Sequence, residues 1–194
     1  MKPINVEGFE RKFQKNIDPW NYTYSPFERF KRGVLLRACG LTKHGRVLEL
    51  GCANGETTLA LRRISLRLLA VDGSVTAIAE ARRRLAVSDH VRFSHVILPE
   101  EMPHGPFDLI VISEIAYYLS QHRLSRLGWQ VAASLAPGGR VVVLNHRRQF
   151  DDAAQHPALA HRRLISDLQR SLLILAHAQF PKFAVAVFLR PRLS

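Results

Sequence analysis

The stretch that most constrains the fold of this chain runs from Val47 to Gly55 and reads Val-Leu-Glu-Leu-Gly-Cys-Ala-Asn-Gly. Its first four residues are mostly apolar, as in a strand that is buried within a parallel sheet. The small residues that follow predict a sharp turn in which the backbone can approach a ligand closely. Apolar residues at 59, 61 and 64 then continue at helical spacing. A strand, a small-residue turn and a helix N-terminus together predict a nucleotide-binding crevice.

Asp72 completes this predicted crevice. It ends the next apolar run, Leu66 to Val71, and it lies 21 residues after Gly51. A carboxylate at that distance can accept hydrogen bonds from both hydroxyl groups of a ribose. Gly73, which follows directly, is included in the same predicted site.

The details of the turn distinguish between classes of nucleotide. A dinucleotide fingerprint that began at Gly51 would need a small residue at position 56, where this chain has a glutamate. Glu49, with small residues at 51, 53 and 55, resembles motif I of the class I S-adenosylmethionine methyltransferases. That cofactor has no phosphate and carries a sulfonium and an ammonium group, so acidic neighbours suit it. The resemblance therefore favours S-adenosylmethionine over a dinucleotide.

The rest of the chain alternates between strands and helices. We predict strands, with helices between the first six, at 46–50, 66–71, 91–95, 107–113, 139–145, 171–180 and 183–190. This pattern predicts a three-layer α/β/α fold, doubly wound, with a mostly parallel seven-stranded, Rossmann-like sheet. Only Pro181-Lys182 separates the last two strands, which is too short for a parallel crossover, so they must form an antiparallel hairpin.

We expect one domain over residues 1–194, in which a cap segment (1–45) precedes the Rossmann-like core (46–194). The cap segment is rich in aromatic residues, and a segment of this kind usually packs over the carboxyl edge of the sheet. We expect Trp20 and Tyr24 to reach the cofactor or to form a lid, and the other aromatics to cover the core. Helices are predicted at 27–41, 74–86, 121–135 and 161–172, with Ser74 as an N-cap.

Two further strand ends supply candidate catalytic residues. Ser113 and Glu114 end the strand at 107–113, which should lie beside the first strand at the crevice. Glu114 is either a carboxylate that orients an attacking amine or accepts its proton, or the N-cap of the next helix. His146 follows the strand at 139–145, where it is either a base that acts near neutral pH or a structural histidine.

The adenine end of the site is less well defined by the sequence. His95 ends the third strand, at a place where this class often has an acidic residue near the adenine amino group. This replacement leaves Val96 and its backbone as the predicted neighbours of adenine. No histidine has the spacing of a metal ligand, so we expect no metal.

Composition limits the partners and the compartment. The net charge of +12 comes largely from arginine pairs that fall on predicted helices, where they can form a solvated face or bind nucleic acid. No aromatics are interleaved with them for base stacking. No apolar run approaches the roughly 20 residues of a membrane span. Two cysteines, Cys39 and Cys52, and the lack of a signal-peptide core predict a cytoplasmic protein.

Longer runs of residues resemble the nodulation protein S (NodS) family. They are Asp18-Pro19-Trp20, the block from Phe27 to Lys31, the run from Leu48 to Ala53 and the run from Phe107 to Leu119. Members of that family N-methylate the free amine of a deacetylated chitooligosaccharide during Nod-factor synthesis. The resemblance implies the same fold, cofactor and class of acceptor here, although His95 and the arginine-rich helices depart from the pattern.

The sequence thus predicts an S-adenosylmethionine-dependent methyltransferase of a small amine, in which Glu114 or His146 handles the acceptor's proton. The predicted cofactor-binding residues are Trp20, Glu49, Gly51, Cys52, Ala53, Asn54, Gly55, Asp72, Gly73, Val96 and Ser113. Two alternatives remain open: an RNA-modifying methyltransferase, and a non-catalytic regulator that only binds the cofactor.

Overall fold

The computed structural model describes residues 4–40, 42–85, 88–149 and 151–192. Its centre is a seven-stranded sheet in the order β3-β2-β1-β4-β5-β7-β6. The strands are β1 (His44–Leu50), β2 (Ser65–Asp72), β3 (Val91–His95), β4 (Phe107–Ser113), β5 (Leu135–His146), β6 (Leu173–Gln179) and β7 (Phe183–Leu189). The first five are parallel, whereas β7 runs antiparallel to both β5 and β6. The predicted sheet and its antiparallel hairpin are confirmed.

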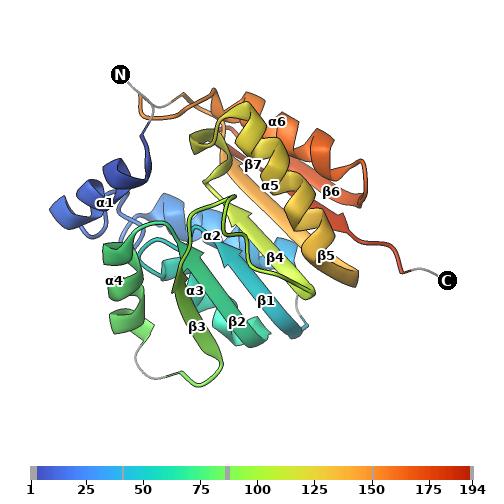
Figure 1. Cartoon of the computed structure of the whole chain (residues 1–194), viewed down its shortest axis with the longest axis horizontal. Coiled ribbons are helices and arrows are strands. Elements are labelled where there is room, and N and C mark those ends of the chain that lie inside the picture. Colours follow the sequence, from blue (N-terminus) through green and yellow to red (C-terminus); the bar gives the residue numbers. More distant parts are fainter. Residues whose placement is uncertain (1–3, 41, 86–87, 150, 193–194) are drawn as a thin grey trace.

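Helices cover both faces of this sheet, which gives the predicted three layers (Figure 1). They are α1 (Val6–Lys15), α2 (Pro26–Cys39), α3 (Glu56–Leu61), α4 (Val75–Leu85), α5 (Gln121–Ser134) and α6 (Pro157–Leu168), with 3-10 turns η1 (Arg62–Ile64) and η2 (Ala116–Tyr118). Alternate strand residues serve the two faces: Val47 packs with α2 and α3, whereas Leu48 packs with α5 and α6. No described helix is both long and apolar enough to cross a membrane.

The predicted starts of α2, α4 and α5 are confirmed to within one residue. The predicted ends at Leu41 and Ala86 lie outside the described residues. Ser25 Oγ accepts a hydrogen bond from the Glu28 amide, and α2 ends at Gly40, which has a φ of +96°. Ser74 Oγ accepts from the Ala77 amide at 3.1 Å and so caps α4. The predicted start of the last helix at His161 is wrong: α6 begins at Pro157, and His156 caps it by accepting from the Ala158 amide.

The predicted helix between the third and fourth strands is also wrong. Residues 96–106 form turns and irregular backbone that lead from β3 to β4. Pro99, Pro103 and Pro106 lie in this segment, and proline has no amide hydrogen with which to continue a helix. Leu98 and Met102 reach the core that α5 and α6 share with the sheet. A loop therefore stands where a helix would have covered β2 and β3 on this face.

The first part of the cap segment packs over the carboxyl edge of the sheet, as predicted, and it includes the helix α1, which the sequence analysis did not identify. Helix α2, which also belongs to the cap segment, covers one face of the sheet. Glu10 of α1 accepts hydrogen bonds from the Ser74 hydroxyl at 2.6 Å and the Thr76 hydroxyl at 2.5 Å, at the start of α4. On the same helix, Lys12 forms an ion pair with Asp152 at 2.7 Å. These contacts hold α1 to both sides of the crevice.

Candidate active site

The turn after β1 has the conformation that its small residues predict. Gly51, Ala53 and Gly55 have φ angles of +74°, +49° and +85°. A Cβ on Gly51 would lie 2.4 Å from Ile115, and one on Gly55 would lie 3.0 Å from Ala81, so both positions require glycine. Ala53 is not a glycine, and the left-handed region costs such a residue about 1–2 kcal/mol. Strain of this kind concentrates at functional sites.

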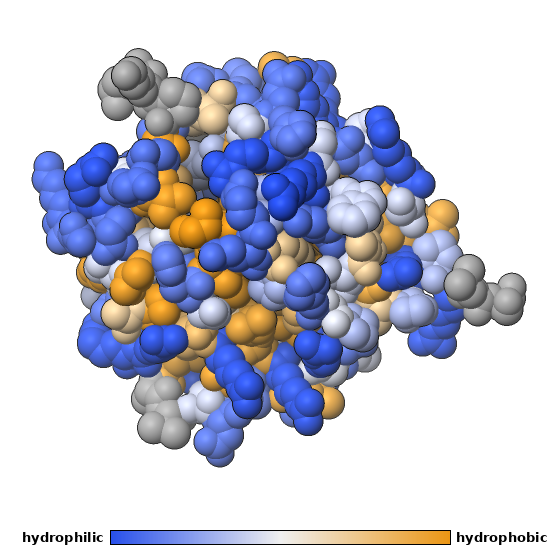
Figure 2. All heavy atoms as spheres, in the orientation of Figure 1, coloured by the Kyte–Doolittle hydropathy of each residue, from blue (hydrophilic) through white to orange (hydrophobic). Residues whose placement is uncertain are grey.

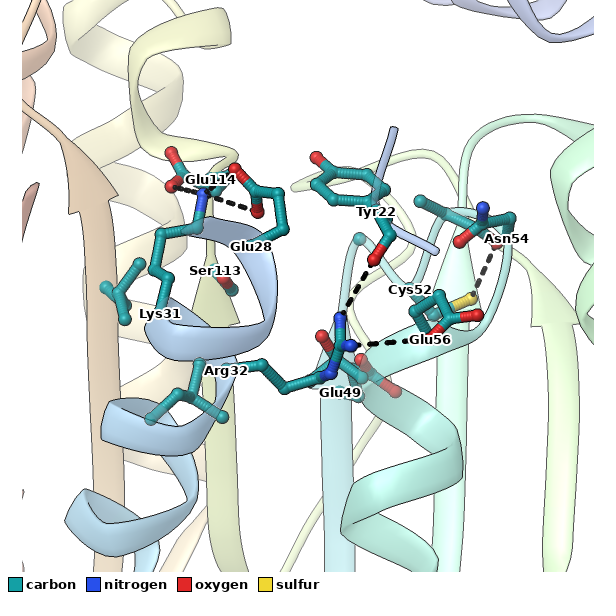
Figure 3. Close-up of a pocket in the computed structure, with 15 residues that line it drawn as sticks. Tyr22, Glu28, Lys31, Arg32, Glu49, Cys52, Asn54, Glu56, Ser113 and Glu114 are labelled. Atoms are coloured by element: carbon teal, nitrogen blue, oxygen red, sulfur yellow. Dashed lines mark hydrogen bonds and ion pairs between the residues drawn. The ribbon is translucent and has the colours of Figure 1, made fainter. Parts of the chain in front are cut away.

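Two adjoining cavities open above this turn, at the carboxyl ends of β1 and β4. The first, of about 480 Å³, lies beneath α2 and is lined mainly by polar and charged residues (Figure 3). The second, of about 810 Å³, lies beneath α1 and is lined mainly by aromatic and aliphatic residues. Both cavities share Tyr22, Gly51, Ala53, Ser113 and Glu114. The two cavities therefore form one crevice with a charged end and an apolar end.

The charged cavity is acidic although the chain is strongly basic. Its charged lining residues are four glutamates, one lysine and one arginine: Glu28, Glu49, Glu56, Glu114, Lys31 and Arg32. The net charge of the whole chain is +12. The lining of this cavity therefore contains more acidic than basic side chains, in contrast to the chain as a whole.

Glu49 lies at the bottom of this cavity, at 2% exposure. One carboxylate oxygen accepts a hydrogen bond from the Thr58 hydroxyl at 2.6 Å. Burial raises the pKa of Glu49 to about 8, although the bond from Thr58 opposes that rise. Glu49 is therefore largely protonated at neutral pH until a positive charge comes near it.

Asn54, in the turn after β1, has an unsatisfied side chain. It is 1% exposed, and neither its Oδ1 nor its Nδ2 has a hydrogen-bond partner among the described residues. A buried polar group without a partner costs about 1–3 kcal/mol. The amide lines the charged cavity, where it offers one acceptor and one donor group to a ligand.

Asp72 lies in the apolar cavity and is held rigidly by the backbone. Its two oxygens accept from the Ala53 amide and the Ser74 amide, both at 2.9 Å. Burial raises the pKa of Asp72, and hydrogen bonds from backbone amides oppose the rise. Trp20 stands in the wall of this cavity, with its ring centroid 5.5 Å from that of Phe13 and 5.6 Å from that of Tyr22. A carboxylate and an aromatic wall therefore share one compartment.

Glu114 lies where the two cavities meet, and it also has a positive φ, of +62°. Its carboxylate accepts from Lys31 Nζ at 2.7 Å, from the Tyr117 hydroxyl at 2.7 Å and from the His146 amide at 2.9 Å. Burial alone would raise the pKa of Glu114, but Lys31 and these hydrogen bonds lower it below its ordinary value. Glu114 is therefore ionised at neutral pH. Because no side chain caps the 3-10 turn that follows, the capping alternative is wrong.

Lys31 connects the cap segment to this carboxylate. Its ammonium group also contacts Glu28 at 2.8 Å, so one buried cation is shared by two glutamates (Figure 3). Burial would lower the pKa of Lys31, but the charges of Glu114 and Glu28 raise it. This arrangement fixes α2 against the end of β4.

The structure brings most of the predicted site residues into the walls of the crevice: Trp20, Glu49, Gly51, Cys52, Ala53, Asn54, Asp72, Gly73, Val96, Ser113 and Glu114. Gly55 is not among the lining residues; it contributes to the turn through its positive φ and its close approach to Ala81. The His146 ring packs against Phe27, at 6.0 Å between centroids, and it is not among the lining residues. Burial lowers the pKa of His146.

The structure differs from the sequence analysis in one aromatic residue and in two basic residues. Tyr24, which we expected to reach the cofactor or to form a lid, is 79% exposed and is not among the residues that line the crevice, whereas Tyr22 lines both cavities. The roles of Lys31 and Arg32 in the crevice were also missed. The available signal was the position of both residues, next to Glu28, on a helix predicted to lie in the cap segment.

Comparison with known proteins gives a consistent result. The family model described as nodulation protein S matches residues 4–172. The curated nodulation protein S of Rhizobium tropici is 33% identical over 127 residues, which cover 64% of this chain and 53% of that protein. The chain thus spans little more than half the length of this relative, and 59% of that of the Sinorhizobium fredii protein.

Solved structures match over a longer part of the chain. The N-methyltransferase NodS from Bradyrhizobium japonicum WM9, crystallised with S-adenosyl-L-homocysteine, has a TM-score of 0.83 and 26% identity. That match covers 97% of this chain and 100% of the other. A putative methyltransferase from Pseudomonas syringae has a TM-score of 0.72 and 33% identity, over 84% of this chain and 99% of the other. The predicted class I methyltransferase fold is confirmed.

Proposed function

The chain belongs to the nodulation protein S family, and we propose that it is an S-adenosylmethionine-dependent methyltransferase that N-methylates a small amine. The observation that carries this proposal is the acidic cavity of a basic chain, joined to an apolar cavity that contains Asp72. S-adenosylmethionine combines these requirements, because its methionine end is cationic and its adenosine end is flat and carries a ribose.

The side chains of the crevice suit this cofactor. Asp72 would accept hydrogen bonds from the ribose hydroxyls, and Val96 and Trp20 would contact the adenine. The unpartnered Asn54 amide would bind the amino-acid end, with its Oδ1 toward the ammonium and its Nδ2 toward the carboxylate. Glu49 would support the ammonium, and Arg32, whose contact with Glu56 is a long 3.5 Å, would support the carboxylate.

The bound cofactor supplies an electrophilic methyl group, and the protein supplies alignment. Ser113 and Glu114 line both cavities and so border the point of transfer. Because its pKa is low, Glu114 is a weak base, and we assign it the task of orienting the amine and stabilising the ammonium that forms. The acceptor must lose its proton before it attacks, so turnover rises with pH through the pKa of the acceptor amine. We assign this proton to solvent, since His146 does not line the crevice.

We propose an amino sugar, first among them a glucosamine oligomer, as the acceptor. The support is family membership. We also propose a cytoplasmic location, which suits the two free, buried cysteines.

Calorimetric titration with S-adenosylhomocysteine tests the cofactor. We expect micromolar binding to the full chain, a loss of at least tenfold in Asp72→Ala, and no binding of NAD. Asp89→Ala removes an exposed carboxylate outside the crevice and serves as the matched control. Binding of NAD, or no binding of the homocysteine compound, would refute the assignment. Methylation of glucosamine oligomers, with acetylated oligomers as the control, then tests the acceptor.

A further inference from the structure

A separate groove lies at the opposite end of the sheet from the crevice. It has a volume of about 1120 Å³ and is formed at the amino ends of β1, β2 and β3. Its lining includes three arginines, one each from β1, β2 and β3: Arg46, Arg67 and Arg92. Leu69 and Phe107 also line it, and His90 and Asp89 lie at its rim beside β3. The proposed methyl transfer uses none of these residues.

The three arginines share one face of the sheet. Arg46 is the direct register partner of Arg67, and Leu69 is the partner of Arg92. Paired residues of neighbouring strands point to the same side, and Leu69 points to the side of α5 and α6. All three arginines therefore project from that side of the sheet.

This part of the face is open because the chain lacks a helix between β3 and β4. In Figure 1 a loop, and no helix, crosses in front of β1 and β2, while α5 covers β4 and β5. Figure 2, in the same orientation, shows hydrophobic atoms below the centre of the molecule, with strongly hydrophilic side chains projecting below them. The groove is thus a direct consequence of the irregular segment 96–106.

The charges in the groove are unbalanced. Arg46 and Arg67 lie directly opposite each other on strands about 4.8 Å apart, and like charges in that position destabilise a sheet. None of the ion pairs among the described residues includes Arg46, Arg67 or Arg92. Asp108 is engaged by the backbone amide of Arg46, at 2.6 Å, and Asp89 is the one acidic residue in the lining.

We propose that this groove is a binding site for a compact phosphate-bearing anion, held by Arg46, Arg67 and Arg92. Guanidinium groups bind phosphate oxygens in pairs, and neighbouring strands place these three close enough to share one multivalent anion. The anion would offset the repulsion between Arg46 and Arg67. A second copy of this +12 chain does not fit, because it would add positive charge. A single-stranded nucleic acid needs exposed rings for stacking, whereas Phe107 is 2% exposed and lies under the Arg46 guanidinium.

The test is calorimetric titration of the full chain with inorganic tripolyphosphate, at about 20 mM salt so that screening is weak. Arg67→Gln and Arg92→Gln each remove one of the three arginine charges of the groove. Arg170→Gln, in the turn after α6, makes the same charge change at a side chain that is 80% exposed, and it is the control. We expect at least tenfold weaker binding in Arg67→Gln and Arg92→Gln, and unchanged binding in Arg170→Gln.

Thermal unfolding supplies a second measurement that does not depend on methyl transfer. Excess tripolyphosphate should raise the melting temperature of the wild type and of Arg170→Gln equally, and that of Arg67→Gln by less. Without the anion, Arg67→Gln should melt higher than the wild type, because the like-charge pair is gone.

Several results would overturn the proposal. One is that tripolyphosphate gives no heat of binding and no shift in the melting temperature of the wild type. Another is that all three variants lose binding equally, which would indicate diffuse attraction of the anion to the net charge. A third is that single-stranded RNA displaces tripolyphosphate and that Arg170→Gln weakens the binding of RNA as much as Arg67→Gln does. The arginines would then belong to a nucleic-acid-binding surface. Titration of S-adenosylhomocysteine should give the same affinity in all variants, so a failure here is distinct from a failure of the proposed function.

Discussion

The two ends of the sheet differ in how their charged side chains are paired. At the carboxyl end, Lys31 is buried between Glu28 and Glu114, and Glu56 contacts Arg84 and Arg32. At the amino end, Arg46 and Arg67 lie opposite each other, and neither belongs to an ion pair among the described residues. A buried charge must be paired because its desolvation is costly, whereas water screens an exposed one. The crevice therefore depends on its pairs, and the groove carries a surplus that remains available for a ligand.

The largest expected effect comes from breaking the buried pair. Lys31→Met leaves two buried carboxylates without their shared cation, which should lower the free energy of unfolding by about 3–5 kcal/mol. The pKa of Glu114 should rise with it, because burial is then opposed only by hydrogen bonds. Urea unfolding at several pH values measures both changes.

Lys12→Met is the matched control for that variant. Its ion pair with Asp152 has the same 2.7 Å length, but 33% of the Lys12 side chain is exposed. We expect a loss of about 1 kcal/mol or less. Equal losses in both variants would mean that burial does not distinguish the two kinds of pair.

The next effect concerns Glu49 and pH. The free protein holds a proton on Glu49 up to a pKa of about 8, and a bound ammonium favours the ionised form. Cofactor binding should then release a proton, so the affinity for S-adenosylhomocysteine should rise with pH by up to about tenfold per unit below pH 8. Calorimetry in buffers of different ionisation enthalpy counts the proton. Glu49→Gln should give a flat profile; an unchanged slope in that variant would assign the proton to another group.

Replacement of Asn54 should reduce the affinity for the cofactor much more than it reduces the stability of the free protein. Asn54→Leu replaces an unpartnered buried amide by an apolar group, so the free protein should lose little stability. The affinity for S-adenosylhomocysteine should nevertheless fall by roughly tenfold, about the value of one or two hydrogen bonds. Denaturant unfolding and calorimetry of the same preparation compare the two. A large loss of stability with intact affinity would show that the amide has a structural role.

The smallest effect is expected at the amino end. Arg67→Glu turns the like pair with Arg46 into an opposite pair on the sheet surface. Such cross-strand pairs contribute about 0.2–1 kcal/mol, so the melting temperature should rise slightly. Added salt should reduce the gain, because exposed charges are screened. A lower melting temperature would show that the aliphatic part of the Arg67 side chain stabilises the sheet more than its charge destabilises it.

Much of the fold and part of the site could be predicted from the sequence, because they depend on neighbours in the chain. Apolar runs located the strands, and the two residues Pro181-Lys182 determined the hairpin between β6 and β7. The spacing from Gly51 to Asp72 placed both in one crevice, since parallel strands bring their carboxyl ends together. The missing helix at 96–106 was the main error, although its three prolines were visible.

Other features were decided only by the tertiary structure. Lys31 and Glu114 are 83 residues apart, and they meet only because α2 docks on the end of β4. The burial of the Asn54 amide without a partner among the described residues, and the opposition of Arg46 and Arg67, likewise depend on how elements pack and on strand register. The spacing of apolar residues along the sequence indicates whether a segment is a helix or a strand and which of its faces is buried. The pairing of charges follows from burial and distance, which exist only once the elements have assembled.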